Sequence, residues 1–248
     1  MGPHRIIVAC PIIVALLIPA TAASAQYRMP DRYQARPLTL PRSVLRPDLG
    51  LRFTSEYEPP PSDRRHNTLD FWLGLGAGLT PDFELGALIA PLRLAPRFDY
   101  LNPEIYVRYR FVRGQAEVGV EGRVELPVDS RGSATIGLPL LIHAGDVVRL
   151  DFGAFLQTDF MDELVLHFPF ALAIQASMPV FFGFETGASV WLEPDRNAVV
   201  PLGFFLGYTI IGRGDPAVDI RVGFRLPDVE RGFDLWEATL GFTFFLYL

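Results

Sequence analysis

The sequence predicts an all-β protein: a transmembrane, antiparallel up-and-down β-barrel of about twelve strands, with ten or fourteen strands as alternatives. Three observations predict it. Runs of about ten residues with alternating polarity recur along the chain, short joints alternate with longer polar ones, and the last strand has an uninterrupted apolar face. Strands of soluble proteins average five or six residues, whereas about ten are needed to cross a bilayer at a tilt.

Residues 1–25 have the features of a cleavable signal peptide. Arg5 precedes an apolar stretch over residues 6–20, and the small residues before Gln26 suit signal peptidase, which we expect to cut after Ala25. Cys10 is the only cysteine. Most of the apolar stretch follows it, which argues against lipidation, and the mature chain is expected to contain no disulfide.

Composition excludes several classes of function. The chain carries a net charge of −6 spread along its length, which argues against nucleic-acid binding. No group of residues has metal-ligand spacing and no glycine-rich loop precedes a helix, so we expect no metal and no cofactor. The glycines Gly74, Gly76 and Gly78 alternate within one strand pattern, where they are expected to relieve crowding inside the barrel.

The mature chain divides into two parts. Residues 26–46 are rich in Arg and Pro and are expected to form an irregular periplasmic lead-in, and residues 47–248 form the barrel. A plug that folds into the mouth of the barrel is an equally open alternative for the lead-in.

Period-two alternation defines the strands of the barrel to within a few residues. We place them near 48–57, 69–79, 83–90, 103–112, 115–126, 133–143, 147–157, 164–175, 180–192, 199–210, 217–226 and 235–248. The joints at 80–82, 113–114, 144–146, 177–179 and 213–216 are short, and the intervening joints are mostly longer and more polar. In membrane barrels short turns face the periplasm and longer loops face outward.

The stretch 164–184 tests the competing reading of a membrane helix, because it contains no Asp, Glu, Lys or Arg. Pro169 and Pro179 would each interrupt helical hydrogen bonding, and His167 would be left in lipid without a partner. We therefore expect a hairpin here.

The charged positions decide which face of each strand meets lipid. A charge that faces hydrocarbon at mid-depth costs roughly 2–4 kcal/mol, so charged side chains are expected to line the lumen. The predicted lumen-lining residues are Arg108, Arg110, Glu117, Glu121, Arg123, Glu125, Arg149, Asp151, Asp219, Arg221, Arg225 and Glu237. Such a charge ladder suits either a pore constriction or a salt-bridged interior.

A second set of inward positions is small or apolar. Its members are Gly137, Pro139, Leu141, Ala171, Ala173, Pro201, Gly203, Phe205 and Gly207. One wall of the lumen is thus expected to be charged and the other apolar. The apolar wall could suit an amphipathic or hydrophobic solute, or it could be where the N-terminal segment or another lumenal element packs.

Candidate catalytic groups are few. His66 lies near Asp63 in the first long loop, His143 adjoins a short turn, and His167 faces the lumen without an obvious serine neighbour. A barrel hydrolase needs a serine or aspartate beside an oriented histidine, so we predict that the chain is not an enzyme.

The C-terminus resembles the assembly signal of bacterial outer-membrane barrel proteins. Residues 239–246 (TLGFTFFL) have a polar Thr239, Gly241 two positions later, and hydrophobic Phe244 and Leu246, with Leu248 in place of the usual terminal aromatic residue. The resemblance implies a porin-like, outer-membrane location in a Gram-negative bacterium, contact with outer-membrane lipid, and folding by the outer-membrane assembly machinery.

These observations together lead to a first expectation of function, a passive channel or small-solute transporter with a narrow, partly charged lumen. A structural or surface-interaction barrel with a blocked lumen is the alternative, and a barrel enzyme is third. The solute and the oligomeric state stay open.

Overall fold

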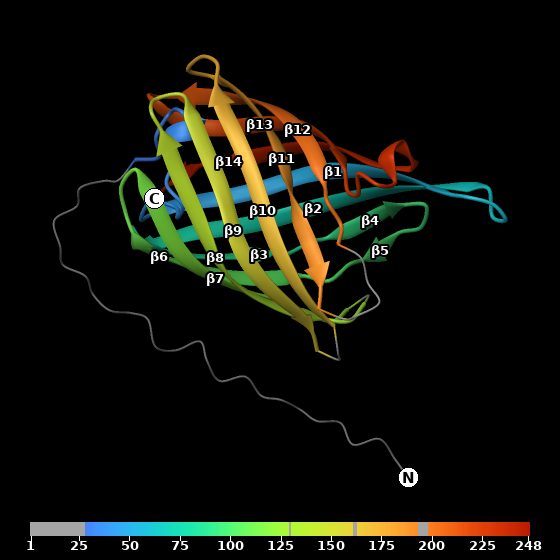
Figure 1. Ribbon diagram of the computed structural model, residues 1–248. Coiled ribbons are helices and arrows are strands. Elements are labelled where there is room, and N and C mark those ends of the chain that lie inside the picture. Colours follow the sequence, from blue (N-terminus) through green and yellow to red (C-terminus); the bar gives the residue numbers. More distant parts are fainter. Residues whose placement is uncertain (1–27, 129, 161–162, 193–197) are drawn as a thin grey trace, which may run out of the picture.

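The computed structural model describes residues 28–248, except 129, 161–162 and 193–197. The expected signal peptide lies outside the described residues. Twelve strands form one closed antiparallel barrel, as predicted, and three short strands extend the same sheet. Figure 1 shows the strands wrapping around a single axis, with the C-terminus at one end of the barrel.

The strand bounds follow the predicted ones closely. They are β1 (Val44–Glu58), β2 (Arg64–Thr80), β3 (Phe83–Leu88), β4 (Leu92–Ala95), β5 (Asp99–Tyr100), β6 (Glu104–Val112), β7 (Ala116–Glu125), β8 (Ser133–Ala144), β9 (Val148–Asp159), β10 (Leu164–Gln175), β11 (Val180–Trp191), β12 (Leu202–Gly212), β13 (Asp215–Leu226), β14 (Leu235–Phe244) and β15 (Leu246–Tyr247). Two short 3-10 helices, η1 (Tyr33–Ala35) and η2 (Gly232–Asp234), complete the described elements. Within the described part of the chain, no helix is long and apolar enough to cross a membrane.

Strand β1 closes the barrel because it pairs on both of its edges. Leu49 lies opposite Phe242 of β14 on one side and opposite Leu73 of β2 on the other. Each remaining strand pairs with its neighbours in the order β14-β13-β12-β11-β10-β9-β8-β7-β6-β3-β2. Among the described residues, each of the twelve barrel strands therefore has a neighbour on both sides, as a sheet in lipid requires.

The sequence predicts a loop at 91–102, but the structure has strands β4 and β5 there, so this prediction is wrong. Strand β2 has 17 residues and β3 only 6, so β2 extends beyond β3 with unpaired backbone groups. Strand β4 pairs with Leu69–Phe71 of β2 and satisfies those groups, and β5 pairs with β4. The first hairpin is also longer than predicted, and its tip projects beyond the rest of the barrel in Figure 1.

The two faces of the sheet differ as the alternation predicts. On β12, the exposed fraction is 63% for Phe204, which points outward, and 4% for its neighbour Phe205, which points inward. Ile136 and Leu138 of β8 are likewise exposed, whereas Leu141 is fully buried. Apolar side chains over the whole exterior form a surface far larger than a water-soluble monomer tolerates, so this face is suited to hydrocarbon.

Residues 28–43, which we call the N-terminal strap, lie inside the barrel at the end where the short turns lie. The strap contacts these turns directly: the Thr39 hydroxyl donates to the Pro81 carbonyl at 3.0 Å, and the Arg32 guanidinium donates to the Asp146 carbonyl at 3.4 Å. The strap therefore enters the barrel at the end where the short turns lie.

Candidate functional site in the barrel lumen

Lumenal carboxylates hold the backbone of the strap. The Leu38 N–H donates to Glu117 Oε2 at 2.8 Å, and the Leu40 N–H donates to Glu84 Oε2 at 2.9 Å. Both carboxylates are buried, with residue exposures of 6% and 0%. Hydrogen bonds to charged acceptors are stronger than neutral ones, so these contacts fix the path of the strap along the wall.

Arginines bind the strap from the other side of its backbone. Arg149 donates to the Arg36 carbonyl at 2.8 Å, and Arg108 donates to the Leu38 carbonyl at 2.9 Å. The strap thus passes β10 and β9, then β7 and β6, then β3, before Ser43 donates to Gly78 of β2. It follows the inner wall through this half of the sheet.

Arg36 reaches in the opposite direction, to the far wall. Its guanidinium forms an ion pair with Asp219 of β13 and donates to the Thr209 hydroxyl of β12 at 3.3 Å. It also lies 4.8 Å from the centre of the Phe245 ring. One side chain therefore connects the strap to the half of the barrel that the strap backbone does not follow.

Apolar packing and missing side chains make room for the strap. Tyr33 stacks on Phe181 with ring centres 4.1 Å apart, within a cluster that includes the predicted apolar-wall residues Ala173 and Phe205. A Cβ atom at Gly78 would lie 2.0 Å from the Pro41 carbonyl oxygen. The glycine at this position therefore lets the strap approach β2.

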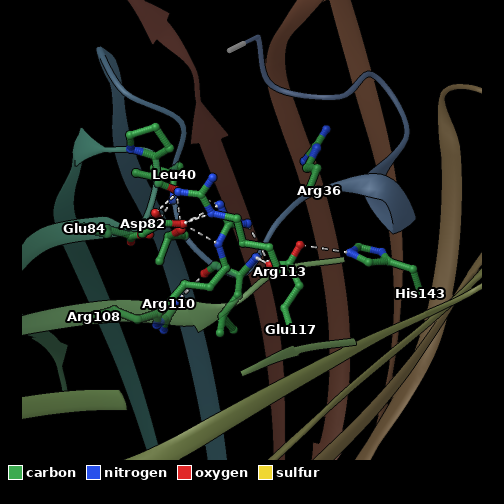
Figure 2. A network of polar contacts seen from close by, with 12 residues as sticks. Arg36, Leu40, Asp82, Glu84, Arg108, Arg110, Arg113, Glu117 and His143 are labelled. Carbon is green, nitrogen blue, oxygen red and sulfur yellow. Dashed lines mark hydrogen bonds and ion pairs between the residues drawn. The ribbon is translucent and has the colours of Figure 1, made fainter. Parts of the chain in front are cut away.

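The predicted charge ladder forms pairs across β6 and β7. Arg108 Nε lies 2.6 Å from Glu121 Oε2, and Arg110 lies 2.9 Å from Glu117. Arg123 also pairs with Glu121. Figure 2 shows Arg108, Arg110 and Glu117 in the same region of the lumen as Asp82 and Glu84, with Leu40 of the strap beside the last two.

The other predicted lumenal residues lie on the same inward face. Arg149 pairs with Asp151 at 2.7 Å, and Glu125 accepts a hydrogen bond from the Ser133 hydroxyl at 3.0 Å. Arg221 pairs with Glu185, and Asp219 pairs with Arg36 as described above. The remaining two, Arg225 and Glu237, make no ion pair or hydrogen bond with any residue that the structure describes.

Sequence reasoning missed several charged residues of this network. They are Arg36, Arg46, Asp48, Arg52, Asp70, Asp82, Glu84 and Glu185. The alternation signal could have found Glu84 and Glu185, since each has the parity of its inward-facing neighbours. Asp82 lies in a short turn, where a hydrogen bond from Arg113 is the largest of the effects that hold the pKa of Asp82 below its ordinary value, despite some desolvation (Figure 2).

Two cavities form a chamber on the long-loop side of the strap. The first, about 350 Å³, is lined by β1, β2 and β11–β14, including Trp72, Arg221 and Glu237. The second, about 360 Å³, lies against the strap and β8–β11, including Pro139 and Phe155. Glu185 and Arg225 line both. The chamber therefore spans both walls of the lumen.

A third cavity, of about 220 Å³, lies beside the strap itself. Strap residues 36–40 line one side of it, and β1, β13 and β14 line the other through residues such as Asp48, Asp219 and Thr243. The charged residues that line it are five arginines (Arg36, Arg46, Arg108, Arg149 and Arg221) and three carboxylates (Asp48, Glu84 and Asp219). The strap thus leaves space at its own level of the barrel.

The last strand places the residues of the C-terminal motif on opposite faces. Thr239 lines the first cavity, and the Gly241 side facing Trp72 is also inward. Phe244 has the parity of the outward face, and Leu246 is 47% exposed.

Two of the three predicted histidines, His66 and His143, contact a carboxylate or the strap. His66 lies 3.5 Å from Glu58 on the exposed first hairpin, and His143 lies 2.6 Å from the Gln34 carbonyl of the strap. Figure 2 shows the second contact of His143, with Glu117 at 3.5 Å.

His167 corrects a sequence expectation, because it does have a serine neighbour. Its Nδ1 lies 2.8 Å from the Ser189 hydroxyl, and its Nε2 lies 2.8 Å from Gln157 Oε1. The three residues come from β10, β11 and β9, and register alone brings His167 opposite Ser189. None of the cavities described above is lined by these three side chains, and the Ser189 N–H already donates to the Val199 carbonyl. Among the described residues, no cluster of ligands could hold a metal ion.

Comparison with known proteins shows what this architecture resembles. No family model matches the chain, and neither does any curated protein. It is similar to the NanC porin, with a TM-score of 0.60, 11% identity, and coverage of 80% of this chain and 100% of that one. For the KdgM porin in complex with disordered oligogalacturonate, the TM-score is 0.59 at 10% identity, over 79% of this chain and 98% of that one. For an outer membrane channel from Pseudomonas putida F1, the TM-score is 0.59 at 10% identity, over 91% of this chain and 100% of that one. The chain therefore has the fold of outer-membrane porins and channels.

Proposed function

We propose that this protein is a passive outer-membrane channel for small solutes, with the short turns and the strap on the periplasmic side. The observation that carries the proposal is the chamber, which reaches both walls of the lumen and adjoins a further cavity beside the strap. The fold shared with porins and channels supports it. Residues 1–25 would then direct secretion and be removed by signal peptidase.

The path of the strap supports a narrowed lumen rather than a filled one. Its backbone is bound along one half of the wall, through Glu84, Arg108, Glu117 and Arg149. A segment that closed the mouth would have to cover the other half as well, where the strap reaches β12 and β13 through the side chains of Arg36 and the exposed Arg28. We propose that solutes pass the strap on that side.

The C-terminal strand supports the proposed route of assembly. Outer-membrane lipid would contact the outward residues Phe244 and Leu246, while Thr239 and Gly241 lie on the inward side. We propose that residues 239–246 act as the signal read by the assembly machinery, as their resemblance to such signals implies.

Conductance tests the channel directly. The mature protein, purified in detergent and inserted into a planar bilayer, should give stable current steps. Continuous silence from protein that still shows heat-modifiable gel migration, and is therefore folded, would favour the structural barrel with a blocked lumen.

One observation favours a second candidate, a hydrolase. The Ser189 hydroxyl, the His167 imidazole and the Gln157 amide form a chain of contacts of the kind that activates a serine nucleophile. An active serine should be labelled by a fluorophosphonate probe, and labelling should disappear in Ser189→Ala. If native protein and Ser189→Ala label equally, this candidate fails and the three residues form a structural hydrogen-bond network.

A further inference from the structure

One arginine in the chamber has no polar partner among the described residues. Arg225 of β13 lines both chamber cavities and makes no ion pair or hydrogen bond with the described residues. The other chamber arginines are engaged. Arg52 pairs with Asp70 at 3.0 Å and Arg149 with Asp151 at 2.7 Å, while Arg108 and Arg221 pair with Glu121 and Glu185.

A glycine on the neighbouring strand leaves space beside the Arg225 side chain. Gly203 of β12 lies opposite Arg225 in the sheet, and a Cβ atom there would lie 3.3 Å from the Arg225 Cβ and Cγ atoms. The absence of a side chain at Gly203 therefore gives the arginine stem a place to lie. Glu237 of β14 is the register neighbour on the other side, and it too makes no polar contact with the described residues.

Most of the side chains that β8, β9 and β10 contribute to the second cavity are apolar, and the two charged ones, Arg149 and Asp151, pair with each other. Pro139, Phe155, Pro169 and Ala171 line it from β8, β9 and β10, and Leu38 of the strap adds to it. A guanidinium binds a carboxylate through two parallel N–H···O bonds, and an apolar wall favours a ligand with an apolar body. A second negative charge on the ligand would meet the carboxylates of Glu185 and Glu237.

We infer that the chamber contains a binding site for a small amphipathic monoanion, namely an aromatic or branched aliphatic carboxylate. Its carboxylate binds Arg225, and its body packs against Pro139, Phe155, Pro169 and Ala171. The inference rests on the proposed channel, because the site lies on the path of the solute. Beyond it, the cavity beside the strap has more arginines than carboxylates in its lining, which suits onward passage of an anion.

Calorimetric titration of the mature protein in detergent tests this site without relying on conductance. The probe is benzoate, compared with acetate, which lacks the body, and benzamide, which lacks the charge, each corrected for titration into empty micelles. Benzoate should bind more tightly than either. Arg225→Gln should weaken benzoate binding about tenfold or more, the size expected for loss of a charged hydrogen-bond partner. Glu237→Gln should tighten it, because a competing carboxylate is removed.

Arg64→Gln is the matched control. It removes the same charge beside the tip of the exposed first hairpin, where no residue lines the chamber, and should leave benzoate binding unchanged. Equal benzoate binding by native protein and folded Arg225→Gln would overturn the inference, as would acetate binding as tightly as benzoate. Conductance of the same samples separates the two proposals: current steps without benzoate binding would refute only the site, and binding without steps would refute only the channel.

Discussion

The Arg36 guanidinium of the strap forms an ion pair with the Asp219 carboxylate of β13, 183 positions further along the chain. Both side chains are nearly buried, with exposures of 5% and 8%. The Thr209 hydroxyl donates a further hydrogen bond to the same carboxylate, at Asp219 Oδ1, over 2.7 Å. This pair connects the strap to the wall that its backbone does not follow.

Breaking this pair should destabilise the barrel strongly. Arg36→Ala or Asp219→Ala leaves one buried charge without its partner, and each should lower the free energy of unfolding by about 3–5 kcal/mol. The double variant should cost less than the sum of the two, as measured by urea unfolding in lipid vesicles. Arg28→Ala is the control, because Arg28 pairs with Asp215 at 3.5 Å while 64% exposed, and it should cost about 1 kcal/mol or less. Additive costs for Arg36 and Asp219 would contradict the coupling.

Reversing both charges of the Arg108–Glu121 pair should restore only part of the stability that each single reversal removes. Arg108→Glu places a carboxylate beside Glu121, and Glu121→Arg places a third guanidinium between Arg108 and Arg123. The double reversal restores one pair, but the new arginine still faces Arg123 and the contact of Arg108 with the Leu38 carbonyl is lost. We expect a coupling energy above about 0.5 kcal/mol with incomplete recovery of stability. A double reversal as stable as the native protein would show that these neighbours contribute nothing.

The faces of the last strand can be compared at two adjacent positions. Leu240→Asp places a carboxylate against lipid and should lower the free energy of unfolding by about 2 kcal/mol or more. Thr239→Asp places the same group in the lumen, opposite Arg52 in the sheet, and should be nearly neutral. Thr243 is not a suitable inward control, because its hydroxyl already donates to Asp48 at 2.6 Å. Equal costs at 239 and 240 would contradict the assignment of lipid and lumen faces.

Orientation in the membrane can be tested by labelling single cysteines, since the only native cysteine is Cys10 within the expected signal peptide. Ser62→Cys lies at the tip of the first hairpin, and Asp146→Cys lies in the short turn between β8 and β9. A membrane-impermeant maleimide should label position 62 on intact cells and position 146 only after the outer membrane is permeabilised. The reverse pattern would place the strap at the cell surface.

The sequence predicted the barrel well because period two carries most of the information. A residue such as Arg108 or Glu121 has its face fixed by its parity and by the cost of exposing a charge to lipid. Cross-strand pairing then follows from the short turn at 113–115, which fixes the register of β6 and β7.

The path of the strap and the contacts of His167 with Ser189 and Gln157 could not be predicted from periodicity. Residues 28–43 have no periodicity, and their partners Glu84, Glu117 and Asp219 are far away in sequence. Ser189 meets His167 only through the register of β10 and β11, which a shift of two residues would change. Strands β4 and β5 were missed because they are short and depend on the unequal lengths of β2 and β3.

The central claim is that solutes pass beside a strap that stays in place, and a covalent tether tests it most directly. A Cβ atom at Gly76 would lie 3.2 Å from Leu40 Cδ1, so Leu40→Cys and Gly76→Cys place two thiols on side chains that adjoin each other. Gel migration with and without reductant first establishes that the disulfide forms. Each single cysteine variant serves as a control for the substitution itself. We predict that single-channel conductance in a planar bilayer is the same for the oxidised and the reduced double variant. Silence on oxidation, with current steps restored by reductant, would contradict the claim and show that the strap must leave the lumen for the channel to open.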